Sequence, residues 1–122
     1  MVVGDQKSYL TVLITLKSKL DSKTGASLDE LNDETINWLK LNGSFATKVS
    51  EAAKDQVINS IIESAISKAN QKSFDNVSKV RKFFILPRDF SIATGELGPT
   101  LKLRRNIVFK IYEREIENMY KL

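Results

Sequence analysis

The chain has 122 residues, with 19 basic and 15 acidic side chains and no histidine or cysteine. The two missing residue types exclude disulfides, thiolate nucleophiles, zinc–thiolate clusters and the Ser-His-Asp triad. A net charge of +4 is too small to indicate a nucleic-acid-binding protein by itself. The composition, 42% hydrophobic and 28% charged, is typical of one globular domain. Because cysteine is absent, we expect this domain in the reducing cytoplasm.

Two β-strands are predicted at the beginning of the chain. Val2 and Val3 predict a short strand, a turn follows at Gly4 and Asp5, and the segment from Tyr9 to Leu16 predicts a second strand. Because the chain begins almost within a strand, we expect it to be the end of a larger protein. No apolar stretch approaches the roughly 20 residues of a transmembrane helix, and we expect neither a membrane span nor a secretory signal.

The next region is predicted to be helical. After a polar connection, Lys17–Ala26, a capping box at Ser27–Glu30 predicts a helix start, with Asn32 as a second possible N-cap, and this helix should end near Gly43. Apolar residues then repeat every three or four positions and predict one amphipathic helix from about Thr47 to Gln71. Its apolar stripe comprises Val49, Ala52, Ala53, Val57, Ile61, Ala65 and Ala69, and it is widened by Ile58, Ile62 and Ile66.

A third strand is predicted at Val80–Leu86. Its second half, Phe83–Leu86, is apolar on both faces, so we expect a central strand that runs parallel to Tyr9–Leu16. A glycine-containing loop, Arg88–Leu101, and one last helix complete the chain. That helix should bury Ile107, Val108, Ile111, Tyr112, Ile116, Met119 and Tyr120. The predicted fold class is α+β, with a small sheet of about three strands packed against two or three helices.

Three cations, Lys102, Arg104 and Arg105, lie where the loop enters the last helix, while Glu113–Glu117 supplies carboxylates toward its other end. This order opposes the helix dipole, so local helix stability does not explain it. Cations, helix N–H groups and a bendable glycine loop together predict a site for an anion such as phosphate or carboxylate. Solvated cations are common near helix starts, and the pattern alone leaves both interpretations open.

The segment from Ile85 to Arg105 closely resembles the last core motif of AMP-forming long-chain acyl-CoA synthetases, members of the adenylate-forming superfamily. The sequence Gly-Glu-Leu-Gly-Pro-Thr at Gly95–Thr100 and the following Lys-Leu-Arg-Arg at Lys102–Arg105 are most similar to the bubblegum branch. The strand pair that starts at Val3 and the helical region Leu31–Lys72 also follow this branch. The likeness covers nearly all of the chain and is most specific in the loop.

The resemblance implies that residues 1–122 are the C-terminal lid domain of such an enzyme. A large N-terminal adenylation domain, which would be the partner of this chain, binds ATP and a long-chain fatty acid in the family. An acyl-adenylate forms there with release of pyrophosphate, and the lid then rotates so that coenzyme A can form the thioester. Mg²⁺ would be bound by the N-terminal domain, and the enzyme would be cytoplasmic or peripheral to a membrane through its other parts.

The resemblance also assigns roles to individual residues. Lys102 matches the lysine that the lid supplies to adenylate formation, and it is the implied catalytic residue. The loop path and the charge around it would come from the implied cofactor-binding residues Gly95, Gly98, Pro99, Thr100, Arg104 and Arg105. No metal ligand is implied in this chain, and no nucleic acid is expected as a partner.

Several motifs of the family are absent from these residues. We find no Ser/Thr/Gly-rich phosphate loop ending in Pro-Lys-Gly, no Tyr-Gly-x-Thr-Glu segment, and no ribose-binding aspartate followed by a Gly-Arg hinge. The isolated chain is therefore expected to bind ATP weakly or not at all and to lack ligase activity. The alternative interpretation is a non-catalytic binding module whose basic loop holds a phosphorylated partner or nucleic acid.

The remaining conspicuous side chains are expected to be structural. Trp38 should pack beside Ile36 and Leu39, because aromatic side chains tend to be buried. Glu96 should pair with a nearby cation. We expect the core to include Phe83, Phe84, Phe90 and Phe109, and the carboxylates of Glu113, Glu115 and Glu117 to be solvated.

Overall fold

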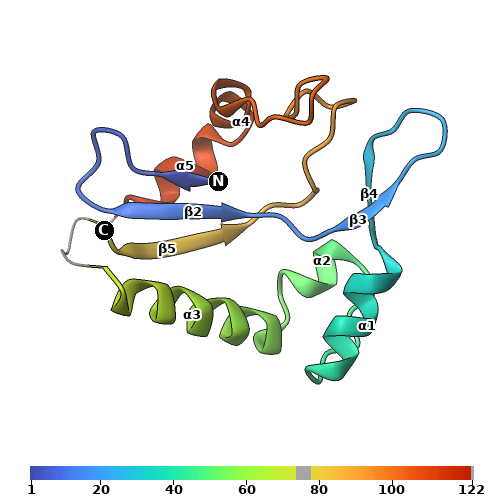
Figure 1. The fold of residues 1–122 in the computed structure, drawn as a ribbon, viewed down its shortest axis with the longest axis horizontal. Coiled ribbons are helices and arrows are strands. Elements are labelled where there is room, and N and C mark those ends of the chain that lie inside the picture. The colour runs from blue at the N-terminus through green and yellow to red at the C-terminus, as the bar shows by residue number, and fades with distance from the viewer. Residues whose placement is uncertain (74–77, 122) are drawn as a thin grey trace.

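The computed structural model describes residues 1–73 and 78–121, which form five strands and five helices (Figure 1). This confirms the predicted α+β class. Three strands make one sheet and two strands make a separate hairpin. The strands are β1 (Val2–Val3), β2 (Leu10–Ile14), β3 (Ser18–Leu20), β4 (Ser27–Leu31) and β5 (Val80–Ile85), and the helices are α1 (Asp33–Leu41), α2 (Val49–Ala52), α3 (Gln56–Gln71), α4 (Arg105–Ile111) and α5 (Glu113–Met119).

The three-stranded sheet has the order β1-β2-β5, with β1 antiparallel and β5 parallel to β2. The predicted parallel connection is therefore confirmed. The prediction that Val80–Leu86 is central was wrong, because β2 lies in the centre and β5 pairs on one side alone within the described chain. Helices lie near both faces of the sheet, which explains why β5 carries apolar residues on both faces (Figure 1). Apolar residues on both faces do not show whether a strand pairs with a second strand on each side.

The sheet separates two apolar clusters. One lies between the sheet and α4–α5, and its buried members are Val3, Leu13, Leu86, Val108, Tyr112, Ile116 and Met119. The other lies on the side of α1–α3 and consists of Leu31, Leu39, Ala46, Val49, Ala52, Ile58 and Ile85. Alternation along the strands explains the division, because neighbouring residues such as Ile85 and Leu86 enter opposite clusters.

The predicted connection and capping box form a β-hairpin instead. β3 and β4 pair antiparallel, and their turn is closed by the Asp21 side chain, which accepts hydrogen bonds from the N–H groups of Lys23 and Thr24. Ser27–Glu30 therefore lies within β4 and caps no helix. Asn32, the second predicted N-cap, caps α1 by accepting the Thr35 N–H at 2.8 Å.

The single helix predicted over Thr47–Gln71 is divided into α2 and α3. Asp55 causes a new start, because its carboxylate accepts the Val57 N–H at 2.8 Å and the Ser44 hydroxyl, also at 2.8 Å. Aspartate favours an N-cap over a helix interior for this reason. The apolar repeat of the sequence runs across the break, so periodicity alone did not reveal it. In α3 the core-facing residues are Ile58 and Ile62, while Ala65 and Ala69 of the predicted stripe are exposed.

The last helix is also divided, at Tyr112, which ends α4 and precedes α5. Tyr112 is buried in the core, and the bend lets Ile116 and Met119 follow it into the same cluster. Glu113 and Glu115 consequently occupy the first turn of α5, where carboxylates agree with the helix dipole. The predicted conflict with the dipole is therefore wrong for Glu113 and Glu115, and it holds for Glu117 and for the cations at the start of α4.

Two aromatic residues predicted to be buried are partly exposed. Trp38 retains 48% of its surface because it is adjacent to the buried Leu39 and thus lies about a quarter turn away on α1. Phe84 retains 37% because it points to the opposite face of β5 from the buried Ile85. Phe83, Phe90 and Phe109 pack against the two clusters as expected. Throughout the described ranges, no helix is both long enough and apolar enough to cross a membrane.

Candidate catalytic loop

The segment between β5 and α4 ends in a narrow turn that carries Lys102. The Gly98 N–H donates to the Lys102 carbonyl at 2.8 Å, and the Leu101 N–H donates to the Gly98 carbonyl, also at 2.8 Å. Leu97 and Leu103 form an antiparallel bridge on either side. We refer to residues 97–103 as the Lys102 turn. Lys102 is exposed, with Pro99 and Thr100 also exposed beside it.

The backbone of this segment requires unusual conformations at two positions. Gly95 has φ of +92°, which glycine adopts without steric cost. Leu101 has φ of +64° although it carries a side chain, and this region is strained for leucine. The strained residue is directly before Lys102 in the chain. The backbone that presents the lysine is therefore held by its surroundings and not by local preference.

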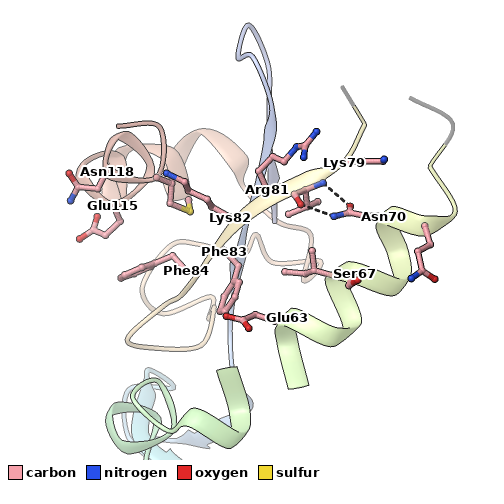
Figure 2. Close-up of a pocket in the computed structure, with 14 residues that line it drawn as sticks. Glu63, Ser67, Asn70, Lys79, Arg81, Lys82, Phe83, Phe84, Glu115 and Asn118 are labelled. Atoms are coloured by element: carbon pink, nitrogen blue, oxygen red, sulfur yellow. Dashed lines mark hydrogen bonds between the residues drawn. The ribbon is translucent and has the colours of Figure 1, made fainter. Parts of the chain in front are cut away.

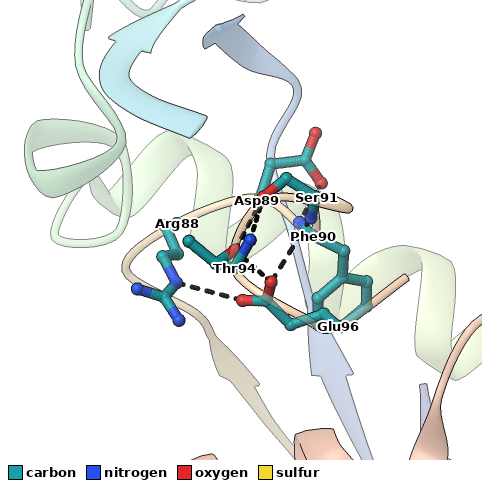
Figure 3. A network of polar contacts seen from close by, with 6 residues as sticks. All are labelled: Arg88, Asp89, Phe90, Ser91, Thr94 and Glu96. Atoms are coloured by element: carbon teal, nitrogen blue, oxygen red, sulfur yellow. Dashed lines mark hydrogen bonds and ion pairs between the residues drawn. The ribbon is translucent and has the colours of Figure 1, made fainter. Parts of the chain in front are cut away.

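A buried carboxylate supplies much of that restraint (Figure 3). Glu96 has no exposed surface, and its Oε2 accepts a hydrogen bond from Arg88 Nε at 3.0 Å. Its Oε1 accepts from the Thr94 hydroxyl and from the Ser91 N–H at 3.4 Å. This confirms that Glu96 pairs with a cation. The Glu96 backbone carbonyl also accepts the Arg104 N–H at 2.8 Å, so one residue fastens both the loop and the start of α4.

The environment keeps this carboxylate ionised. Burial acts to raise the pKa of Glu96, but hydrogen bonds from Thr94, Arg88 and the backbone outweigh it and hold the pKa below its usual value. Burial raises the pKa of the Tyr112 hydroxyl, an effect opposed by the nearby Arg88 charge. Arg88 therefore lies within electrostatic reach of both Glu96 and the bend between α4 and α5.

The three predicted cations are not brought together at one point. Arg105 donates to the Val2 carbonyl at 2.7 Å and so fastens α4 to β1. Arg104 lies against Gly98, where an added Cβ would be 3.4 Å from its Nε. Among residues 1–73 and 78–121, Lys102 has no carboxylate within ion-pair distance. The Arg104 side chain is likewise exposed and without an ion pair among these residues, so the charges of Lys102 and Arg104 are both available to a ligand.

The structure thus groups some of the predicted residues and separates others. Gly98, Pro99 and Thr100 share one turn with Lys102, and Arg104 lies at its base. Gly95 precedes the turn, where an added Cβ would lie 3.7 Å from the Ile107 side chain, and Arg105 is directed to β1. Sequence reasoning missed Arg88, because its partner is eight residues away and nothing in the spacing identifies it. The strain at Leu101 had no signal in the sequence.

The Lys102 turn is an exposed projection. Neither of the two best-formed cavities in the described part of the chain is lined by residues of the loop. The described residues also contain no group of three carboxylate-type side chains that could hold a metal ion. A bound anion at Lys102 would therefore need a second surface to enclose it and exclude water.

Comparison with curated proteins identifies close relatives of the whole chain. It is 41% identical to the long-chain-fatty-acid–CoA ligase heimdall of Drosophila melanogaster over 99% of the chain, and 43% and 40% identical to the long-chain-fatty-acid–CoA ligases ACSBG2 of Xenopus laevis and Homo sapiens over 98%. The chain spans 16–21% of the length of these relatives. No family model and no solved structure matches the chain.

Proposed function

We propose that this chain forms a lid over the active site of a long-chain fatty acid–CoA ligase. The chain belongs to that ligase family and corresponds to a C-terminal segment of its members. Lys102 would enter that site for acyl-adenylate formation. The observation that supports this role is the geometry of the Lys102 turn. It presents an ammonium group that has no carboxylate within ion-pair distance in the described part of the chain. This exposed projection is braced from behind by the ion pair between Arg88 and the buried Glu96 carboxylate.

The chemistry that such a lysine would assist is the attack of a fatty acid carboxylate on the α-phosphorus of ATP. A carboxylate oxygen forms the new P–O bond as pyrophosphate leaves, and the two reacting groups are both anionic. A positive charge beside them lowers their repulsion as they approach. One charge pair at 4 Å is worth roughly 4 kcal/mol at an effective dielectric constant near 20, before the cost of desolvating the lysine.

Lysine suits this position because a compact ammonium group needs no bidentate geometry on a domain that moves. Arg104 would add positive charge at the base of the turn, while Arg105 would keep α4 fixed to β1. Pro99 and Thr100 would contact the opposing surface. ATP, coenzyme A, the fatty acid and Mg²⁺ would be bound mainly by the adenylation domain, because the Lys102 turn is a projection and the described residues include no metal-binding cluster.

The coupling of the loop to the rest of the domain is relevant to lid movement. Glu96 fastens the turn to α4 through its backbone carbonyl. Its carboxylate binds Arg88, which comes three residues after the end of β5, so the ion pair also connects the loop to the sheet. Rotation of the sheet and helices would therefore carry Lys102 as part of one body. The loop would not need to refold between the adenylation and thioester steps.

Deletion of residues 1–122 from a full-length ligase that carries this chain tests the proposal. We expect loss of acyl-adenylate formation from fatty acid and ATP, measured by pyrophosphate release, with the adenylation domain still folded. The isolated chain should form no thioester. Thioester formation by the isolated chain, or full adenylation without it, would contradict the proposal. The latter result, together with binding of a phosphorylated partner to the isolated chain, would favour a non-catalytic binding module.

A further inference from the structure

A groove of about 800 Å³ runs along the outer edge of β5, between α3 and α5 (Figure 2). It lies away from the Lys102 turn, and no residue of that turn lines it. Its floor and walls are largely apolar. We refer to it as the β5 groove, and its lining includes Ile66, Ser67, Val80, Phe83, Phe84 and Met119.

The backbone at the floor of this groove has no neighbouring strand. The Leu86 N–H donates to the Ile14 carbonyl at 2.8 Å, so Leu86 faces β2. Because successive residues of a strand alternate in direction, Phe84 also faces β2, and Phe83 turns its N–H and C=O toward the open edge. Within the described ranges, no strand pairs with this edge. An unpaired edge is a template for an added strand.

One side chain already pairs with this edge as an added strand would. The Asn70 amide accepts the Val80 N–H at 2.9 Å and donates to the Val80 carbonyl at 2.8 Å. The two hydrogen bonds satisfy Val80 and close the edge at the beginning of β5, as Figure 2 shows. Further along β5, no hydrogen bond from a described residue of α3 closes the edge at Phe83, where Glu63, Ile66 and the short Ser67 line the groove.

The charges around the groove differ between its two ends. Lys79 and Arg81 lie at the end closed by Asn70. Glu63 is seven residues before Asn70 on α3, a distance of about 10 Å along the helix at 1.5 Å per residue. Because the same distance spans about three residues of a strand, Glu63 lies beside Phe83, as Figure 2 shows. Glu115 adds a second carboxylate from α5. Lys82 also lines the groove, on the side of α5, and its Nζ donates to the Lys121 carbonyl at 3.2 Å. The groove is therefore basic at the end closed by Asn70, whereas Phe83 and α5 are accompanied by two carboxylates and one lysine.

We infer that the β5 groove binds an extended segment of another polypeptide, which adds a strand to β5 at Phe83. The segment would be apolar in its centre, with an acidic residue near Lys79 and Arg81 and a basic residue near Glu63 and Glu115. Backbone hydrogen bonds would supply affinity, and the two helices would contact alternate side chains.

Two other occupants fit these features less well. An acyl chain would leave the Phe83 N–H and C=O unpaired and would place methylene groups beside two carboxylates. A second copy of this chain, paired antiparallel through Phe83, would bring both Glu63 side chains next to the same two-fold axis, where they repel each other. A polypeptide of mixed charge satisfies both the backbone and the carboxylates.

The inference is tested with the 122-residue chain and two synthetic peptides, acetyl-Asp-Val-Thr-Val-Thr-Val-Lys-amide and its reversed sequence, which together cover parallel and antiparallel pairing. We expect saturable binding of at least one, measured by calorimetry, and slower amide exchange at Phe83 in the complex. A control peptide with lysine at both ends should bind at least tenfold more weakly. Binding of neither peptide, or equal binding of the control, would overturn the inference.

Two serines of α3 provide matched variants. Ser67 and Ser64 are both exposed, but Ser67 lines the groove and Ser64 does not. Ser67→Trp should weaken peptide binding at least tenfold, while Ser64→Trp should leave it unchanged, with circular dichroism confirming that both fold. Should Ser67→Trp not fold, Arg81→Glu should weaken binding of the same peptide. Three results would contradict a polypeptide partner. Peptide binding could be unchanged in the folded variants, palmitate could compete with the peptide, or the chain could dimerise and slow amide exchange at Phe83 without peptide.

Discussion

Arg88 and Glu96 form a hydrogen-bonded ion pair of 3.0 Å behind the Lys102 turn, and Glu96 contributes to it from a fully buried position. Through its backbone carbonyl, Glu96 also holds the N–H of Arg104 at the start of α4. The end of β5, the loop and α4 are thereby connected at one residue. The position of the exposed lysine is thus set by a carboxylate that solvent does not reach.

Replacement of Glu96 tests this restraint. Glu96→Gln keeps the shape of the side chain but removes the charge that Arg88 faces, and we expect the free energy of unfolding to fall by about 1–3 kcal/mol. The effect should lie toward the lower value, because Arg88 retains 37% side-chain exposure. Urea unfolding measures the change. Glu117→Gln, at an exposed position of α5, is the control, and an equal effect of both substitutions would contradict the assigned restraint.

The same carboxylate should make stability depend on pH. Its pKa is lowered in the folded chain relative to the ordinary value of 4.5, so the unfolded chain binds the proton more readily. The contribution of Glu96 to stability is then fully present above that value and is lost as the pH falls through the lower, folded value. The difference in unfolding free energy between the original chain and Glu96→Gln should narrow with acidification below about pH 4.5. A constant difference from pH 7 to pH 2 would show that Glu96 titrates normally.

Leu101 carries backbone strain that can be removed. Because φ of +64° is strained for leucine and free for glycine, Leu101→Gly should raise the free energy of unfolding by about 0.5–1 kcal/mol, although the unfolded chain gains entropy. Thr100→Gly, at the neighbouring exposed position without positive φ, should instead lower it by a similar amount. Thermal unfolding compares the two. Destabilisation by both substitutions would mean that Leu101 is not strained.

Much of the fold was predictable because it depends on local pattern. The first two strands, the parallel pairing of β2 with β5 and the helical region between them follow from apolar runs and their spacing. Helix breaks were not predictable from the same pattern. Asp55 caps α3 through the local Val57 N–H and the more distant Ser44 hydroxyl, but it lies inside a continuous apolar repeat of the sequence. Tyr112 interrupts the last helix where it enters the core beneath α5.

The choice between two helix starts shows how local signals compete. Ser27 and Asn32 both qualify as N-caps, and Ser27 enters β4 because that segment pairs with β3. Asn32→Ala should therefore lower the free energy of unfolding by about 1 kcal/mol, measured by chemical unfolding. Ser27→Ala should have little effect, since its buried hydroxyl has no hydrogen-bond partner among the described residues. The reverse ranking would support the capping box.

The candidate site was predictable in part for the same reason. Lys102 and the glycines around it could be selected because they are contiguous and resemble a known motif. The brace behind them could not, because Arg88, Glu96 and Tyr112 are brought together by the path of the chain. Charge spacing suggested that Arg104 and Arg105 would join Lys102 at one anion. The start of α4 turns Arg105 to the Val2 carbonyl instead.

The proposed role of Lys102 is tested most directly by measuring the two half-reactions in a full-length ligase that carries this chain. The Lys102→Ala variant is compared with Lys110→Ala, because Lys110 is an exposed lysine in the last turn of α4. Pyrophosphate release reports acyl-adenylate formation, and supplied acyl-adenylate with coenzyme A reports the thioester step. We predict that Lys102→Ala slows adenylate formation by about 10²–10³ and spares the thioester step, while Lys110→Ala changes neither. Equal slowing of both half-reactions by Lys102→Ala, or no slowing of adenylate formation, would contradict the role of Lys102.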